Sequence, residues 1–236
     1  MKDRIIVALD TDSPEAALET VKALSGEVGM FKVGMELFPR GGPELVRRIC
    51  EAGFNVFLDL KFHDIPNTVA GAVRSAAALG VKFATVHASG GRAMLKAAAE
   101  SARGTGTTLL AVTVLTSLDD VDLVDVGFSL GAAEAVTRLA DLAVSCGLVG
   151  IVCSAKEVEA VRARVGKGVT LVTPGVRMPE DSLGDQKRVV TPADAIRRGA
   201  DYIVVGRPIT KAIDPAAAAR TIAASMRGVF PEGGRY

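Results

Sequence analysis

Residues 55–87 read NVFLDLKFHDIPNTVAGAVRSAAALGVKFATVH, and this stretch decides the fold class of the chain. It opens with the mostly apolar run Asn55–Leu60 and closes with the run Phe83–His87, both of strand length. An alanine-rich stretch with helical spacing lies between them and stops at Gly80, a residue that readily ends a helix. Two strands joined by a helix predict a βαβ unit of a parallel sheet.

The same alternation continues in both directions along the chain. Capping side chains stand directly before a proline at Ser13-Pro14, Thr191-Pro192 and Asp214-Pro215, which predicts three helix starts. Six further short runs rich in Val, Ile and Leu complete a set of eight predicted strands: Arg4–Leu9, Met30–Gly34, Leu109–Val114, Val149–Val152, Val169–Thr173 and Tyr202–Gly206. Eight strand–helix units predict an α/β fold closed into a (β/α)8 TIM barrel.

Length and composition favour one domain and a small-molecule ligand. The chain has 236 residues, 49% of them hydrophobic, and no linker or change of composition divides it, so we expect a single domain over residues 1–236. The formal net charge is only +1, and the sequence has no basic run that could contact several phosphates of a nucleic-acid backbone, so nucleic acid is not an expected partner. The absence of tryptophan also leaves no obvious platform for stacked bases.

Cysteine usage and the amino-terminal segment predict a cytoplasmic protein. Cys50, Cys146 and Cys153 form no CxxC pair and leave one odd thiol, which fits a reducing compartment and makes a structural metal improbable. The first apolar run, Ile5–Leu9, is interrupted by Asp10 and is too short for a signal peptide or a membrane span. We therefore expect no membrane association.

Charged residues gather at the ends of the first three predicted strands. Asp10 ends the first, Lys32 lies in the second, and Asp59 and Lys61 close the third, with Asp64 in the turn that follows. Catalytic groups of TIM barrels sit at the carboxyl ends of the strands. Side chains alternate along a strand, which puts Asp59 and Lys61 on one face with Cα atoms about 6.5 Å apart. We expect these charges to share one pocket.

A lysine held among carboxylates predicts acid chemistry. Opposite charges favour the ammonium form, so Lys61 is suited to donate a proton and not to form a Schiff base. The competing interpretation is a network of buried ion pairs that only closes the barrel. Four or five charges at the strand ends argue against it, because burying so many charges is costly without a function.

The last predicted strand runs into Gly206-Arg207, which predicts a phosphate site. A glycine lets backbone N–H groups approach phosphate oxygens, and the arginine guanidinium is a permanent bidentate donor. Arg177 and Gln186 are further candidate donors in the irregular stretch Pro174–Val190, whose length indicates a functional loop or lid. Any of these side chains could instead be ordinary surface.

Three more polar residues lie near strand ends. Thr116 follows the fifth predicted strand, where it could contact a ligand or cap the next segment. His63 and His87 are the only histidines, and they lack the spacing of metal ligands. We expect both histidines to be structural, and we expect no metal site.

The ten residues Asp59 to Thr68, DLKFHDIPNT, resemble the Asp-x-Lys-x-x-Asp motif and the Ile-Pro-x-Thr continuation of the orotidine 5'-phosphate decarboxylase family. The resemblance spans essentially the whole chain and implies decarboxylation of orotidine 5'-phosphate to UMP without a cofactor. Further matching segments are Val7–Asp10, Phe31–Gly34, Leu115–Ser117, Thr173–Arg177 and Val205–Ile209.

The resemblance also implies roles for single residues. Lys61 would protonate C6 of the pyrimidine after CO2 leaves, within a charged catalytic network of Lys32, Asp59, Lys61 and Asp64, and Asp59 would lie near the substrate carboxylate. It implies a homodimer whose active sites lie at the interface, each receiving Asp64 and Thr68 from the neighbouring subunit. The remaining contacts implied are Asp10 and Lys32 to the ribose, Thr116 to the pyrimidine, Gln186, Gly206 and Arg207 to the phosphate, and Arg177 in the closing loop.

Three different functions remain open for the sequence. Sugar-phosphate lyases such as 3-keto-L-gulonate 6-phosphate decarboxylase and hexulose phosphate synthase use a similar motif with magnesium, and they place a glutamate near the second strand. Glu36 lies there, but Lys32 and the Ile65–Thr68 continuation favour orotidylate. The second function is that of a Schiff-base aldolase using Lys61, and the third is that of a non-catalytic barrel that binds a phosphorylated ligand.

Overall fold

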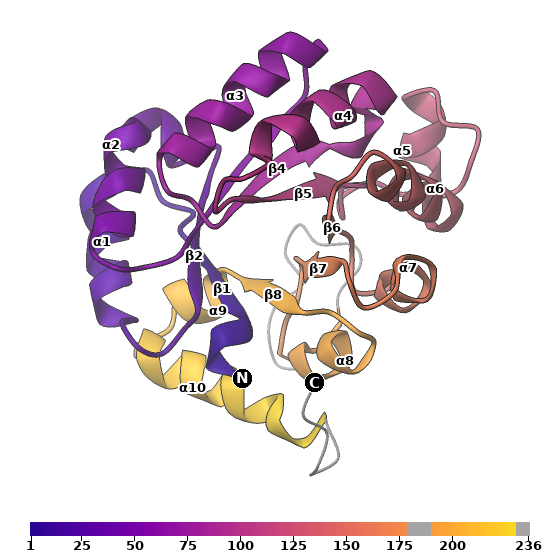
Figure 1. Ribbon diagram of the computed structural model, residues 1–236. Helices are drawn as coiled ribbons and strands as arrows, with labels where there is room; N and C mark the ends of the chain where they lie inside the picture. The colour runs from indigo at the N-terminus through magenta and orange to yellow at the C-terminus, as the bar shows by residue number, and fades with distance from the viewer. Residues whose placement is uncertain (179–189, 230–236) are drawn as a thin grey trace.

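The computed structural model describes residues 1–178 and 190–229, and its strands form a closed parallel barrel (Figure 1). The strands follow one another around the barrel in sequence order, and the last pairs with the first. They are β1 (Ile5–Ala8), β2 (Met30–Gly34), β3 (Val56–Phe62), β4 (Phe83–His87), β5 (Thr108–Val112), β6 (Gly150–Val152), β7 (Thr170–Thr173) and β8 (Tyr202–Val205). This confirms the predicted (β/α)8 TIM barrel.

Helices connect the strands and form the outer ring of the barrel (Figure 1). They are α1 (Pro14–Ala23), α2 (Phe38–Glu51), α3 (Pro66–Ala78), α4 (Gly91–Ala102), α5 (Asp120–Asp125), α6 (Ala132–Ser145), α7 (Val158–Val165), α8 (Pro192–Arg197), α9 (Arg207–Thr210) and α10 (Pro215–Ser225), with short 3-10 turns at Lys2–Arg4, Ala88–Gly90 and Arg227–Val229. No helix among residues 1–178 and 190–229 is long and apolar enough to cross a membrane.

The predicted helix signals act as expected. The side chains of Ser13, Thr191 and Asp214 each accept a hydrogen bond from a backbone N–H in the first turn of α1, α8 and α10. Gly80 has a φ of 80° just after α3, a conformation that costs glycine little. Predicted and observed strand ends differ by small amounts, and the difference that matters is at β3, which continues past Leu60 to Phe62.

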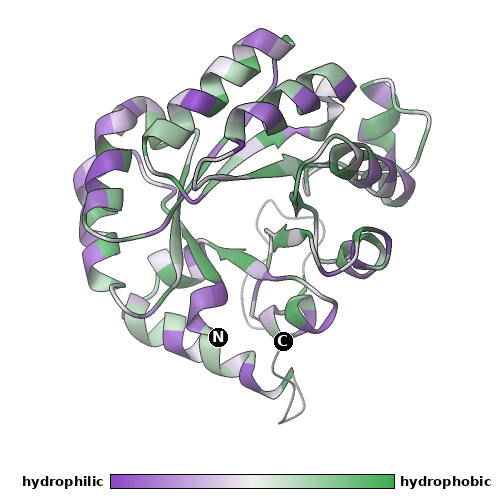
Figure 2. Ribbon diagram, viewed as in Figure 1, coloured by the Kyte–Doolittle hydropathy of each residue, from purple (hydrophilic) through white to green (hydrophobic). Residues whose placement is uncertain are grey.

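Alternation along the strands separates two apolar layers. Odd-numbered positions of β1, such as Ile5 and Val7, pack outward under the helices, whose apolar sides face the barrel (Figure 2). The side chains that fill the barrel interior are Ile6, Ala8, Met30, Phe57, Phe83, Leu110, Val172 and Val204. A residue two positions beyond one of these therefore points into the mouth of the barrel, at the carboxyl ends of the strands.

Candidate functional site

A cavity of about 660 Å³ opens at the carboxyl ends of the strands, above the apolar interior. Ala8, Phe57 and Val204 form part of its floor, and the inward residue two positions after each is Asp10, Asp59 or Gly206. Most of the predicted site residues line this cavity: Asp10, Lys32, Asp59, Lys61, Thr116, Arg177, Gly206 and Arg207. The fold thus brings them together from strands that are far apart in the sequence.

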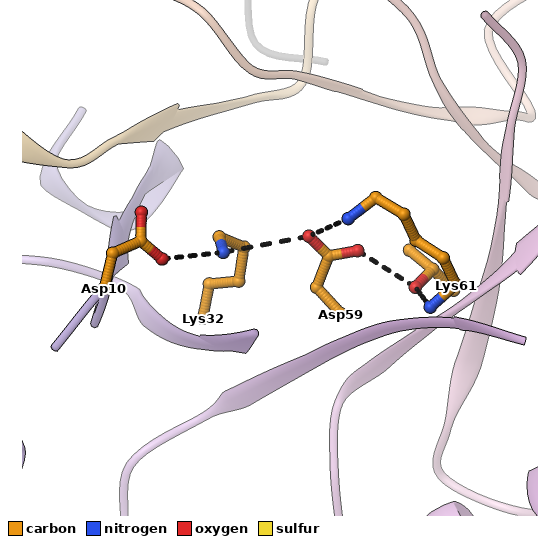
Figure 3. A network of polar contacts seen from close by, with 5 residues as sticks. Asp10, Lys32, Asp59 and Lys61 are labelled. Carbon is orange, nitrogen blue, oxygen red and sulfur yellow. Dashed lines mark hydrogen bonds and ion pairs between the residues drawn. The ribbon is translucent and has the colours of Figure 1, made fainter. Parts of the chain in front are cut away.

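Four charged side chains form a row with alternating sign across the cavity (Figure 3). The Lys32 ammonium lies 3.2 Å from Asp10 Oδ1 and 3.7 Å from Asp59 Oδ2. The Lys61 ammonium donates a hydrogen bond of 2.9 Å to the same Asp59 Oδ2. Two cations therefore converge on one carboxylate oxygen, and Asp59 and Lys61 share one pocket, as their spacing predicted.

Three of these four side chains are largely buried, and Asp10 is the exposed one. The Asp10 side chain is 54% exposed, whereas those of Lys32, Asp59 and Lys61 are 12%, 13% and 22% exposed. Removing ions from water costs several kcal/mol per ion unless they are well paired. The Lys32–Asp59–Lys61 cluster is consequently a preorganised set of largely buried charges, whose mutual interactions are stronger than they would be in bulk water.

The backbone at Lys61 departs from regular strand geometry. Lys61 has a φ of 51° and is the only non-glycine residue with positive φ in the part of the chain that the structure describes. Strand register shifts at the same place, since Leu58 pairs with Ala84 but Phe62 pairs with Val86. Bulges of this kind re-aim side chains and are common beside active sites. Here the bulge presents the Lys61 ammonium to Asp59.

Thr85 joins this cluster, and we did not predict it from the sequence. It is fully buried on β4, at the inward position after Phe83. Its hydroxyl donates to Asp59 Oδ1 at 3.0 Å and accepts from the Lys61 backbone N–H at 2.9 Å. The available signal was its position, because a polar side chain two residues beyond an inward Phe83 must face the barrel mouth.

Gly34 at the end of β2 keeps space for the cluster. A Cβ atom at this position would lie 2.9 Å from Lys32 Nζ, closer than real Cβ contacts allow. A side chain at residue 34 would therefore push the ammonium away from Asp10 or Asp59. The contacted atom is the end of a flexible side chain, so the cost would fall on the position of the ammonium and not on the backbone, whose φ at residue 34 is not in the left-handed region.

The predicted phosphate residues lie at the β8 side of the cavity. Gly206 and Arg207 line it where β8 leads into α9. Arg177 lines it from the segment after β7, is 9% exposed, and donates a hydrogen bond of 2.9 Å to the Val176 carbonyl. Val176 and Val190 form an isolated parallel bridge at the base of the predicted loop. Gln186 and the rest of that loop, residues 179–189, lie outside the described residues.

Asp64 and Thr68 are not among the residues that line the cavity in the described part of this chain. Both are exposed, Asp64 in the β3–α3 connection and Thr68 in the first turn of α3, and the Asp64 carboxylate accepts a hydrogen bond of 2.6 Å from the Ile65 backbone N–H. Their positions leave both side chains available to another molecule.

The two histidines lie next to one another beside the cluster, with ring centroids 5.4 Å apart. Burial lowers the pKa of His87 below its ordinary value of 6.5, and the neighbouring His63 and Lys61 act in the same direction while Asp59 opposes them. Within residues 1–178 and 190–229, no three His, Cys, Asp or Glu side chains are grouped so that they could hold a metal ion.

A parallel eight-stranded barrel with a charged cavity at the carboxyl ends of its strands defines a TIM-barrel enzyme. The sequence matches the family described as orotidine 5'-phosphate decarboxylase / HUMPS over residues 3–222, and the chain belongs to this family.

Relatives and a solved structure agree with this assignment. A protein of Anaeromyxobacter sp. (strain K) named orotidine 5'-phosphate decarboxylase is 57% identical over 224 residues, which cover 95% of this chain and 98% of the relative. A protein of the same name from Moorella thermoacetica is 52% identical, over 97% of this chain and 94% of the relative. The crystal structure of orotidine 5'-phosphate decarboxylase from Lactobacillus acidophilus superposes with a TM-score of 0.83 at 39% identity and covers 94% of this chain and 98% of its own.

Proposed function

We propose that this chain decarboxylates orotidine 5'-phosphate to UMP in pyrimidine biosynthesis, without a cofactor. The observation that carries the proposal is the Asp10–Lys32–Asp59–Lys61 row across the cavity. It is supported by membership of the family and by relatives that bear this enzyme's name over nearly their whole length.

The charges suit this reaction because decarboxylation leaves a carbanion at C6 that no adjacent carbonyl can delocalise. The C6–carboxylate bond breaks, CO2 departs, and the electron pair stays on C6. The Lys61 ammonium stabilises that pair by its charge and then transfers a proton to C6, which yields UMP and a neutral amine that solvent reprotonates. Its hydrogen bond to Asp59 holds the ammonium in place before the substrate binds.

Asp59 also acts on the ground state of the substrate. Its carboxylate lies beside Lys61, so a substrate carboxylate near Lys61 would be close to a second negative charge, and losing CO2 relieves that repulsion. Lys32 compensates Asp59 from the other side, and Lys32 with Asp10 offers a donor and an acceptor to the ribose hydroxyls.

The β8 side of the cavity would hold the phosphate. Gly206 supplies backbone at the end of β8 and Arg207 a guanidinium, while Arg177 lies at the base of the predicted closing loop. Gln186 belongs to the same proposal as a phosphate ligand, although it lies outside the described residues. Phosphate binding far from C6 can contribute to catalysis by driving loop closure over the site. Thr116 lines the cavity and would contact the pyrimidine.

The test is conversion of orotidine 5'-phosphate, followed by ultraviolet absorbance with purified protein in excess EDTA. We expect fast formation of UMP by the wild type. Lys61→Ala should lower kcat by a factor on the order of 10⁴ or more, since it removes a general acid and a stabilising charge together. A well-folded wild type that gives no UMP would refute the proposal.

We also propose a homodimer in which Asp64 and Thr68 complete the neighbour's site. It is supported by their exposure and by their position outside this chain's own cavity lining. Co-expression of Lys61→Ala with Asp64→Asn should then restore up to about one quarter of wild-type activity, because half of the dimers would carry one intact site out of two. No recovery above the separate variants would reject shared sites.

A metal-dependent sugar-phosphate lyase is the second candidate. The family includes the HUMPS group, and Glu36, near the second strand where those lyases are expected to place a metal-binding glutamate, lines the cavity. EDTA separates the two functions, since it would abolish magnesium-supported turnover of keto-gulonate phosphate and leave orotidylate decarboxylation unchanged.

Cytoplasmic location and a single domain over residues 1–236 are part of the same proposal. Cys50, Cys146 and Cys153 all lie in the described part of the chain and form no disulfide, which suits a reducing compartment. The family match over residues 3–222 supports one domain.

A further inference from the structure

We propose that Thr85 is a positioning residue for this decarboxylation, acting through Asp59 and Lys61. The inference rests on the proposed function, because it assigns Thr85 to the same reaction. Thr85 would not touch the substrate. Its one hydroxyl would fix both the plane of the Asp59 carboxylate and the backbone that carries the Lys61 ammonium.

The hydroxyl is fully used by the two groups. Its hydrogen is donated to Asp59 Oδ1 at 3.0 Å, and its oxygen accepts the Lys61 backbone N–H at 2.9 Å. Thr85 is 0% exposed, so water does not compete for either bond. β-branching also restricts the side chain to few rotamers, which makes the hydroxyl a fixed reference point.

Asp59 needs this contact to hold one orientation. Both ammonium groups approach Oδ2, Lys61 at 2.9 Å and Lys32 at 3.7 Å. The terminal torsion of an aspartate is broad, and contacts on both carboxylate oxygens restrain it more tightly than contacts on one oxygen alone. The Thr85 hydroxyl binds the other oxygen, Oδ1, and so sets the plane of the carboxylate.

Lys61 needs the contact for a different reason. Its φ of 51° is unfavourable for a residue with a side chain, and the register shift in β3 takes its N–H out of the regular ladder with β4. Strained conformations persist only where the surroundings determine them. The Thr85 oxygen accepts the N–H that the bulge would otherwise leave without a strand partner.

The test compares Thr85→Val, which keeps the shape and removes the hydroxyl, with Thr85→Ser, which keeps the hydroxyl. A misplacement of about 1 Å can cost about a hundredfold in rate, so a smaller shift in Thr85→Val should lower kcat by about tenfold with KM within about twofold. Thr85→Ser should stay within about threefold of the wild-type kcat, since both hydrogen bonds can form.

Thr107→Val is the matched control. Thr107 is 7% exposed, and its hydroxyl donates a hydrogen bond of 2.7 Å to the Val81 carbonyl just before β5, at the amino end of the barrel. This variant also loses a buried threonine hydrogen bond, so it should fall in melting temperature as Thr85→Val does. Its kcat should equal that of the wild type.

The inference is overturned if Thr85→Val keeps wild-type kcat, if Thr85→Ser is impaired as much as Thr85→Val, or if Thr107→Val lowers kcat equally. Should Thr85→Val fail to fold, Thr85→Ala replaces it in the comparison with Thr85→Ser. All values are ratios to the wild type with orotidine 5'-phosphate. Failure of the wild type itself would therefore refute the proposed function, whereas a normal wild type with a normal Thr85→Val would refute only the role of Thr85.

Discussion

The backbone at residue 61 predicts that glycine is more stable there than alanine. Lys61 has a φ of 51°, and the left-handed region costs a non-glycine residue about 1–2 kcal/mol. Glycine avoids this cost but loses about 0.4–1 kcal/mol more conformational entropy on folding. At the middle of these two ranges, Lys61→Gly is more stable than Lys61→Ala by about 0.8 kcal/mol. Both variants lack the ammonium, so the lost ion pair with Asp59 cancels in the comparison.

Urea unfolding of the two variants measures this difference in the free energy of unfolding. In thermal unfolding, for a chain of this size, we expect the melting temperature of Lys61→Gly to be higher than that of Lys61→Ala by about 1–4 °C. Thr170 on β7 provides the control, since its φ is not positive and alanine should there be more stable than glycine by about 0.5–1 kcal/mol. If Lys61→Ala equalled or exceeded Lys61→Gly in stability, the backbone at residue 61 would not be strained and the reasoning would be wrong.

Two further predictions concern the phosphate end and the histidine pair. Arg207→Ala should lower kcat/KM by about ten- to a hundredfold, because hydrogen bonds to a charged group contribute about 1.5–3 kcal/mol. The exposed surface arginine Arg220, paired with Glu27, is the control, and equal activities of Arg207→Ala and Arg220→Ala would exclude a phosphate role. The pKa of His87 is lower in the folded than in the unfolded chain, so below about pH 6.5 the unfolded chain binds a proton that the folded chain does not. The free energy of unfolding therefore decreases as the pH falls from about 6.5 to the pKa of His87 in the folded chain. His87→Gln should flatten this loss in melting temperature between about pH 7.5 and pH 5, and parallel curves would contradict the assignment.

The barrel could be predicted because its signals are local. Each strand is a short apolar run, and each predicted helix start carries its own cap, as at Ser13. Position at the strand ends indicated much of the site, and the structure shows why: Asp59 lies two residues beyond the inward Phe57, and Lys32 lies two residues beyond the inward Met30. Closure into a barrel required only the number of strands and the rule that parallel neighbours follow in sequence.

The parts that escaped prediction depend on contacts between segments. The bulge at Lys61 arises where β3 and β4 change register, and no glycine at residue 61 marks the positive φ. Thr85 appeared only as one polar residue in an apolar run, because its partners lie on the neighbouring strand. The proposed sharing of Asp64 and Thr68 between subunits depends on a second chain, and pattern analysis of one chain does not specify that surface.

Residue 61 is a lysine in a backbone conformation that favours glycine, and the function of its side chain accounts for this mismatch. Glycine would relax the backbone, but it would remove the ammonium that the charged row positions against Asp59. The strain is therefore inseparable from the side chain, and its cost of about 1–2 kcal/mol has to be offset by contacts elsewhere. Two such contacts are the Lys61 side chain to Asp59 and the Lys61 backbone N–H to Thr85. Because the Thr85 hydroxyl also holds Asp59, the same group restrains both ends of the Lys61–Asp59 pair, and loosening it should disturb catalysis more than stability.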